Sequence, residues 1–224
     1  MATTAQVDHL VVMAATLAQG VQWCEATLGI TPGPGGQHAL MGTHNRLFTI
    51  ASPRYPQAYF EIIAIDRAAP APGRQRWFDM DDPTLREQLA RAAPQLVHFA
   101  ASVADARASV AALAALDIDR GALVQASRPA ARGLLQWQIT VRNDGQRLFN
   151  GCLPTLIQWG DVHPTQDMPD SGVTLQELQV SHPQVKALDA AYHAIGLSGV
   201  SIQEGPANLR AHLLTPRGVV EIHS

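Results

Sequence analysis

One acidic residue interrupts an otherwise apolar segment and is the strongest chemical signal in the sequence. Glu61 lies in the run Tyr59–Asp66 (YFEIIAID), whose β-branched and aromatic residues predict a strand. Side chains alternate across a strand, so we expect Glu61 to share a face with Tyr59, Ile63 and Ile65. A carboxylate on an apolar face is costly unless a cation, a metal ion or hydrogen-bond donors meet it. Glu61 is therefore a candidate catalytic or metal-binding residue.

The elements that must position Glu61 recur along the chain. The order strand, helix and three strands is predicted three times, and the third copy is shorter. We expect these copies to act as one functional unit with four parts: a first module at residues 1–66, a connecting segment with a short helix at 67–95, a second module at 96–160, and a linker with a third module at 161–224.

Metal-capable or hydrogen-bonding side chains occupy matching positions of the three modules. The matching sets are His9, His98 and Glu177 in the first strand, and Glu61, Gln158 and Glu221 in the last strand. A strand histidine is often a hydrogen-bonded core residue, and Glu61 could instead form a structural ion pair with Arg46 or Arg76. Repetition at both positions favours a metal site or a polar substrate site.

Composition excludes several classes of protein. The 224 residues are 46% hydrophobic and 16% charged, which predicts a packed core. The formal net charge is −3 and no basic block is present, so nucleic acids and anionic membranes are not expected partners. No apolar stretch is long enough to span a bilayer, and no signal peptide is apparent. With only two cysteines, a reduced cytoplasmic protein is expected.

Several motifs resemble a known superfamily over nearly the whole chain. The module openings Val7–Leu10 (VDHL) and Val97–Ala100 (VHFA), with the repeat itself, resemble the vicinal oxygen chelate superfamily. Within it, Gly42–Asn45 (GTHN), Tyr59–Ala64 (YFEIIA) and Leu156–Gly160 (LIQWG) resemble the bacterial glyoxalase-like domain family. The implied fold class is α+β, with βαβββ modules that form a curled mixed β-sheet, or incomplete barrel, around a central cavity.

The resemblance also implies a metal site inside that barrel. Carried over by position, the ligands are His9, Glu61, His98 and Gln158, and Gln158 stands where glutamate is more usual. Such a set suits zinc, nickel, manganese or iron, and an absent metal is equally compatible with the family. A bound ion with open positions would hold two adjacent substrate oxygens.

Substrate contacts are expected from residues near the mouth of the barrel. His44, Asn45 and Arg46 follow a glycine, which predicts either a simple turn or a loop that offers polar groups to a small-molecule ligand. Trp77 lies in a proline- and arginine-rich segment that either covers the barrel edge or forms a lid, and Trp159 is expected to pack in the core or line the cavity. A homodimer is a further expectation.

Three functional hypotheses remain open at this level. The leading one is a metal-dependent lyase, isomerase or dioxygenase type of enzyme that acts on a small oxygenated metabolite. The second is a metal-free protein that binds and sequesters a small molecule in the same cavity. The third is a metal-free enzyme that uses Glu61 as a general base.

Overall fold

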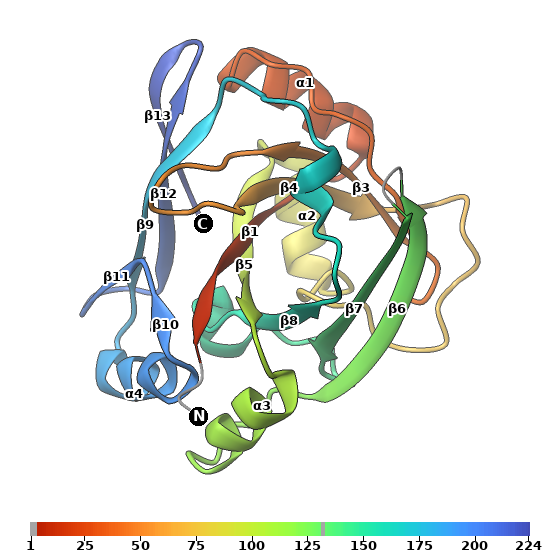
Figure 1. Cartoon of the computed structure of the whole chain (residues 1–224). Helices are drawn as coiled ribbons and strands as arrows, with labels where there is room; N and C mark the ends of the chain where they lie inside the picture. Colours follow the sequence, from red (N-terminus) through yellow and green to blue (C-terminus); the bar gives the residue numbers. More distant parts are fainter. Residues whose placement is uncertain (1–3, 131–132) are drawn as a thin grey trace.

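A curled mixed β-sheet forms the centre of the protein (Figure 1). The computed structural model describes residues 4–130 and 133–224. Within these residues the sheet contains nine strands: β1 (Ala5–Met13), β2 (Gln37–His38), β3 (Thr43–Thr49), β4 (Tyr59–Ile65), β5 (Gln95–Val103), β6 (Ala122–Ala130), β7 (Gly133–Val141), β8 (Thr155–Trp159) and β10 (Leu197–Ser198). Their order is β2-β3-β4-β1-β5-β8-β7-β6, with β10 also paired to β1.

The sheet consists of two halves with the same connectivity. β1 runs parallel to β4, β5 runs parallel to β8, and the halves join through the antiparallel pair β1–β5. Each half has the order strand, helix and three strands, and together they curl into a half-barrel (Figure 1). The expected α+β class with a curled mixed sheet is therefore confirmed.

The helices pack against the sheets, and the first three each begin at a side chain that caps the helix. They are α1 (Leu17–Thr27), α2 (Pro83–Arg91), α3 (Ala106–Ala114) and α4 (Val185–Ile195), with short 3-10 turns η1 (Leu148–Gly151) and η2 (Pro164–Asp167). Thr16, Asp82 and Asp105 each accept a backbone hydrogen bond at the start of a helix. α4 ends at Gly196, whose φ of 64° is the left-handed conformation typical of a helix terminus.

β1 is buried on both faces, which explains its nearly continuous apolar sequence. Leu10 and Val12 pack with Phe60 in the large core between the sheet and the elements that cover it. Val11 and Met13 face the opposite side and join a smaller apolar cluster. A strand buried in this way is fixed in register, because a slip by one residue would exchange its two faces.

The last part of the chain forms a second sheet beside the first (Figure 1), and its last two strands contact β5. Its strands are β9 (Thr174–Ser181), β11 (Val200–Gln203), β12 (Asn208–Thr215) and β13 (Gly218–His223), in the order β11-β9-β12-β13. Tyr55 connects the two sheets, because its hydroxyl donates to Gly199 O at 2.6 Å and accepts from Leu178 N at 3.1 Å. In the described part of the chain, no helix has the length and apolar character needed to span a bilayer.

Candidate functional site

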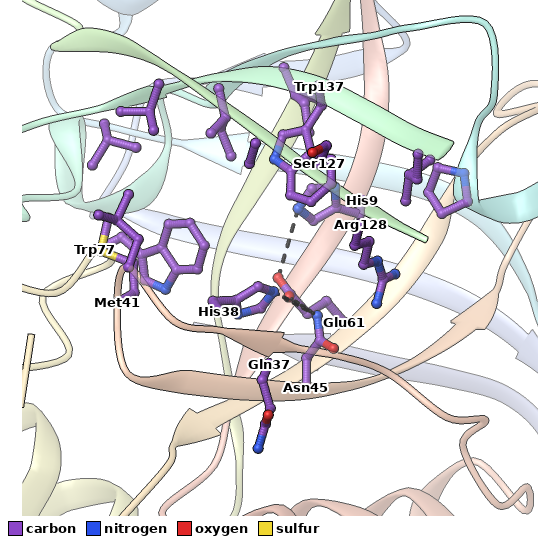
Figure 2. Close-up of a pocket in the computed structure, with 18 of the residues that line it drawn as sticks. His9, Gln37, His38, Met41, Asn45, Glu61, Trp77, Ser127, Arg128 and Trp137 are labelled. Atoms are coloured by element: carbon purple, nitrogen blue, oxygen red, sulfur yellow. Dashed lines mark hydrogen bonds and ion pairs between the residues drawn. The ribbon is translucent and has the colours of Figure 1, made fainter. Parts of the chain in front are cut away.

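The curled sheet encloses a cavity of about 320 Å³ between its two halves (Figure 2). One wall comes from β1, β3 and β4, and the facing wall comes from β6, β7 and β8. Most of the lining is apolar, and the polar side chains gather at one end. That polar group comprises His9, Gln37, His38, Asn45, Glu61, Ser127 and Arg128.

Glu61 occupies the centre of the polar end, as expected from its place in an apolar strand. It is 6% exposed, and its Oε1 accepts a hydrogen bond from Asn45 Nδ2 at 2.6 Å. Its Oε2 lies 3.8 Å from His9 Nε2, and Figure 2 shows the two side chains facing each other. The partners of Glu61 are therefore Asn45 and His9, rather than the arginines Arg46 or Arg76.

His9 is oriented by its sequence neighbour Asp8. Val7 pairs with Ala101 and His9 pairs with Ala100, so Asp8 is an extra residue in β1. Such a β-bulge changes the direction of a side chain and breaks the strict alternation of the strand. Asp8 Oδ1 consequently lies 2.6 Å from His9 Nδ1, which leaves Nε2 of His9 for the cavity.

Asp8 also contacts two other side chains. Its Oδ2 accepts from Trp159 Nε1 at 2.8 Å and lies 3.2 Å from His163 Nε2. Burial opposes ionisation of Asp8, but the hydrogen bonds from His163 and His9 outweigh it and lower the Asp8 pKa to about 2. Asp8 is therefore an ionised carboxylate beneath the cavity floor.

A second network fixes Asn45 behind Glu61. Gly36 N donates to Asn45 Oδ1 at 2.7 Å, so the amide NH2 group faces Glu61 and, at 3.3 Å, His38 Nε2. His38 Nδ1 lies 2.9 Å from Thr43 Oγ1. Burial lowers the His38 pKa, which favours a neutral ring that accepts a hydrogen bond from Asn45.

Aromatic rings form much of the remaining wall. Tyr59 stacks on His9 with ring centroids 4.5 Å apart, and Trp137 lies 5.6 Å from Trp159. Trp77, from the segment between β4 and α2, meets the ring of His38 edge-on at 5.0 Å. The cavity therefore offers a small ligand flat apolar surfaces beside one cluster of polar groups.

The structure does not bring the four residues expected to bind metal together. His98 is fully buried, and its Nδ1 and Nε2 lie 2.9 Å from Gly151 O and Thr155 Oγ1, respectively. Gln158 lies on the opposite face of β8 from the cavity-lining residues Ile157 and Trp159, and its Oε1 accepts from Ala106 N at 2.9 Å. His98 and Gln158 thus satisfy the fold's own hydrogen bonds, whereas His9 and Glu61 line the cavity.

The donor set consequently does not fit the expected four-ligand metal site. In residues 4–130 and 133–224, no three histidine, cysteine, aspartate or glutamate side chains are arranged to hold a metal ion. His9 Nε2 and Glu61 Oε2 remain available to a ligand after the contacts with Asp8 and Asn45, and such a pair is suited to proton transfer.

Only some of the residues expected to contact substrate line the cavity. His44, Asn45 and Arg46 belong to strand β3 and not to a loop, so they alternate between its two faces. Asn45 lines the cavity, whereas His44 lies 3.9 Å from Asp66 Oδ2 and Arg46 is exposed.

The two tryptophans, by contrast, both line the cavity: Trp77 and Trp159. The segment that carries Trp77 is anchored by an ion pair between Arg76 Nη1 and Asp81 Oδ1 at 2.6 Å.

Six polar residues of the site were missed in the sequence: Asp8, Gln37, His38, Ser127, Arg128 and His163. Asp8 had a detectable signal, because an aspartate beside a histidine within an apolar strand is as costly to bury as Glu61. His38, His163 and Arg128 lie in segments whose position around the cavity depends on the folded chain.

Comparisons with known proteins agree with this architecture. No curated protein sequence matches the chain. A hypothetical protein from Staphylococcus aureus superposes with a TM-score of 0.60 at 12% identity, over 91% of this chain and 87% of that one. Its likeness shows the fold alone.

More distant structures come from Streptomyces coelicolor. One is a methylmalonyl-CoA epimerase variant, with a TM-score of 0.43 and 16% identity over 70% of this chain and 96% of that one. Another is a mutant of 4-hydroxymandelate synthase, with a TM-score of 0.47 and 12% identity over 98% of this chain and 62% of that one.

The family model described as "Glyoxalase-like domain" matches residues 7–196, which include both halves of the curled sheet. The chain therefore belongs to the glyoxalase-like domain family.

Proposed function

We propose that the protein is an enzyme that removes a proton from a carbon atom beside a carbonyl group. The observation that carries this proposal is the pair formed by His9 Nε2 and Glu61 Oε2, 3.8 Å apart at the polar end of an apolar cavity. A base and an acid on one side of a small substrate are the requirements for enolisation.

Glu61 is the proposed base. Asn45 engages Oε1, so Oε2 is the oxygen directed at the ligand space and at His9. In the proposed step, Oε2 takes the proton of the C–H bond, and the electron pair of that bond forms a carbon–carbon double bond. The former carbonyl oxygen becomes an enolate or enol oxygen.

His9 is the proposed acid. Its Nδ1–H donates to Asp8, so a second proton on Nε2 is available to the carbonyl oxygen of the substrate. The buried carboxylate of Asp8 stabilises the positive charge of that doubly protonated ring. A proton added to the opposite face of the same carbon gives an epimerase. For an α-hydroxy carbonyl compound, a proton added to the former carbonyl carbon, with the neighbouring hydroxyl becoming the new carbonyl, gives an isomerase, and loss of a neighbouring group gives a lyase.

The burial of His9 and Glu61, which are 5% and 6% exposed, supports this chemistry because it keeps water away from the reacting pair. Interactions between charges and a developing enolate are stronger in a medium of low dielectric constant. The rings of Tyr59 and Trp159 lie close to the Asp8–His9 pair and shield it from solvent.

Deuterium exchange tests the proposed proton removal whichever product the enzyme forms. Hydroxyacetone, phenylacetone and phenylpyruvate would each be incubated with the protein in D2O, and loss of the C–H signal followed by proton NMR. We expect exchange above the buffer rate for at least one compound, and a strong reduction in Glu61→Gln and His9→Gln. Absence of enzyme-dependent exchange, or exchange equal in both variants and wild type, would overturn the proposal and favour a binding protein.

A further inference from the structure

A single arginine introduces positive charge into the cavity. Of the lysine and arginine side chains in the described ranges, Arg128 is the only one that lines it, and it projects from β6. No carboxylate within residues 4–130 or 133–224 forms an ion pair with Arg128. Figure 2 places Arg128 on the same side of the cavity as Glu61 and Asn45.

The loop before β2 leaves room for this guanidinium. A Cβ atom on Gly36 would lie 2.3 Å from Arg128 Nη1, so the absence of a side chain at Gly36 permits the close approach. Gly36 also donates its N–H to Asn45. The same residue therefore positions both the group behind Glu61 and the guanidinium of Arg128.

Arg128 stands between the cavity and the outside of the barrel. A second pocket of about 360 Å³ lies along residues 30–34 and 167–171, and it shares Arg128, Leu47, Leu135 and Pro164 with the cavity. A ligand group bound by Arg128 would thus remain near solvent while the rest of the ligand lies deeper.

The cavity also has a defined polarity. Glu61 contributes a carboxylate and Arg128 a guanidinium, yet the two do not pair with each other. An anionic group is attracted to Arg128 and repelled by Glu61, so a substrate with one carboxylate would bind in one direction.

The apolar surfaces indicate the remainder of the ligand. Trp77, Trp137 and Trp159 present aromatic surface, and Trp77 Nε1 is a buried donor without a hydrogen-bond partner in the described structure. Flat apolar groups stack well on such surfaces, and an acceptor on the ligand would satisfy the unpaired indole N–H.

We propose that Arg128 binds a substrate carboxylate, and that the cavity therefore takes small monocarboxylates with a flat apolar body. This inference rests on the proposed function in one respect, because the carbonyl group of such an acid would lie at His9 and Glu61. A guanidinium binds a carboxylate through two parallel hydrogen bonds, which gives both attraction and orientation.

Binding measurements test this inference independently of turnover. Phenylacetate and 2-naphthoate would be titrated into the intact chain by isothermal calorimetry, beside phenylacetamide, which has the shape of phenylacetate without its charge. We expect the acid to bind at least about tenfold more tightly than the amide, the size of effect typical of one charge-assisted hydrogen-bond pair.

Variants locate the source of that preference. Arg128→Gln should abolish the difference between acid and amide, and Arg128→Lys should retain part of it because the charge remains without the planar fork. Gly36→Ala should weaken acid binding by displacing the guanidinium. Arg46→Gln is the matched control, because Arg46 is an exposed arginine outside the cavity.

The outcomes separate this inference from the proposed function. Failure of both acids to bind the wild type, or equal preference for the acid in wild type and Arg128→Gln, would overturn the role of Arg128. Arg128-dependent binding without any deuterium exchange would support the carboxylate site and overturn the proposed chemistry. Exchange of neutral ketones without binding of carboxylates would support the proposed chemistry and overturn the carboxylate site at Arg128.

Discussion

Asp8 and His9 are adjacent in the chain, and yet the carboxylate of one lies 2.6 Å from the imidazole of the other. Neighbouring side chains of a regular strand point to opposite faces, so this contact depends on the bulge at Asp8. The bulge holds Nδ1 of His9 at Asp8 and directs Nε2 toward Glu61.

Replacement of Asp8 by asparagine tests this orientation. Asp8→Asn keeps the shape but loses the negative charge, and the new NH2 group would favour a His9 ring with its proton on Nε2. We expect catalysis to fall by roughly a hundredfold or more, the direction seen when the carboxylate of a catalytic dyad is neutralised. Nitrogen-15 NMR of His9 would report the tautomer, and a wild-type tautomer in the variant would contradict this assignment.

The same residue predicts a pH dependence of stability. The Asp8 pKa is lowered from 3.8 to about 2 in the folded protein, so Asp8 stabilises the fold above its unfolded pKa and loses this contribution as the pH falls toward 2. The free energy of unfolding of the wild type, relative to Asp8→Asn, should fall by about 2 kcal/mol between about pH 5 and about pH 2. Denaturant titrations at several pH values would measure it, and a constant difference would disprove an ionised Asp8.

Glu61→Gln separates binding from catalysis. Glutamine can still accept the hydrogen bond from Asn45 through its Oε1, so the cavity should keep its shape and its affinity for ligand. Proton removal should fall by roughly a hundredfold or more, because an amide is not a base at neutral pH. Calorimetry and the exchange assay together measure the two effects, with Asn45→Ala as a variant expected to impair both.

Metal removal should leave the protein unaffected. The expected ligands His98 and Gln158 are engaged by Gly151, Thr155 and Ala106, so no four-ligand site is formed by the expected set. We expect dialysis against a strong chelator to change neither the melting temperature nor the exchange rate. A loss restored by one divalent ion would show that another donor set exists.

His98 should act on stability alone. Burial, and secondarily the charge of Arg120, hold the His98 pKa well below its usual range, so the ring is neutral and hydrogen-bonded in the core. His98→Ala should cost about 3 kcal/mol or more of unfolding free energy, from a cavity and lost hydrogen bonds. Chemical denaturation would measure this loss, and an unchanged midpoint would contradict a structural role.

Tyr55→Phe tests the connection between the two sheets. Loss of the hydroxyl leaves Leu178 N and Gly199 O without this partner and should cost about 1–3 kcal/mol. Thermal unfolding by circular dichroism would measure the change. Thr49→Val, which removes a 3.5 Å contact to Ala58 O and a 3.3 Å hydrogen bond from Ala51 N, is the control expected to show a smaller loss because both contacts are longer than those of Tyr55.

The order of elements was accessible from the sequence because it depends on local patterns. Apolar runs, capping residues and terminal glycines predict the strands and helices of all three modules, and the strand predicted at Tyr59–Asp66 is observed as β4 (Tyr59–Ile65). The pair Leu197–Ser198 was missed, since two residues carry no periodicity and β10 exists only through its pairing with β1.

Side-chain direction was less accessible. The alignment of the modules predicts that Gln158 lies inside the barrel. In the structure its neighbours Ile157 and Trp159 line the cavity instead, so the alignment is wrong by one position. The bulges in β1 and β5 change side-chain directions in the same way, and periodicity alone does not reveal them. Glu61 was accessible as a cavity-lining residue because its neighbours on both sides in β4 are apolar.

The pairing of β10 with β1 has a consequence for biosynthesis. Ala5 and Gln6 pair with Leu197 and Ser198, which cover the edge of β1 ahead of the first residue of β4. On the ribosome, the first residues of the strand that carries Asp8 and His9 must therefore wait for nearly the whole chain before their edge is covered. We expect nascent chains that stop before Leu197 to expose this edge, and chaperones or proteases to compete for it during that interval.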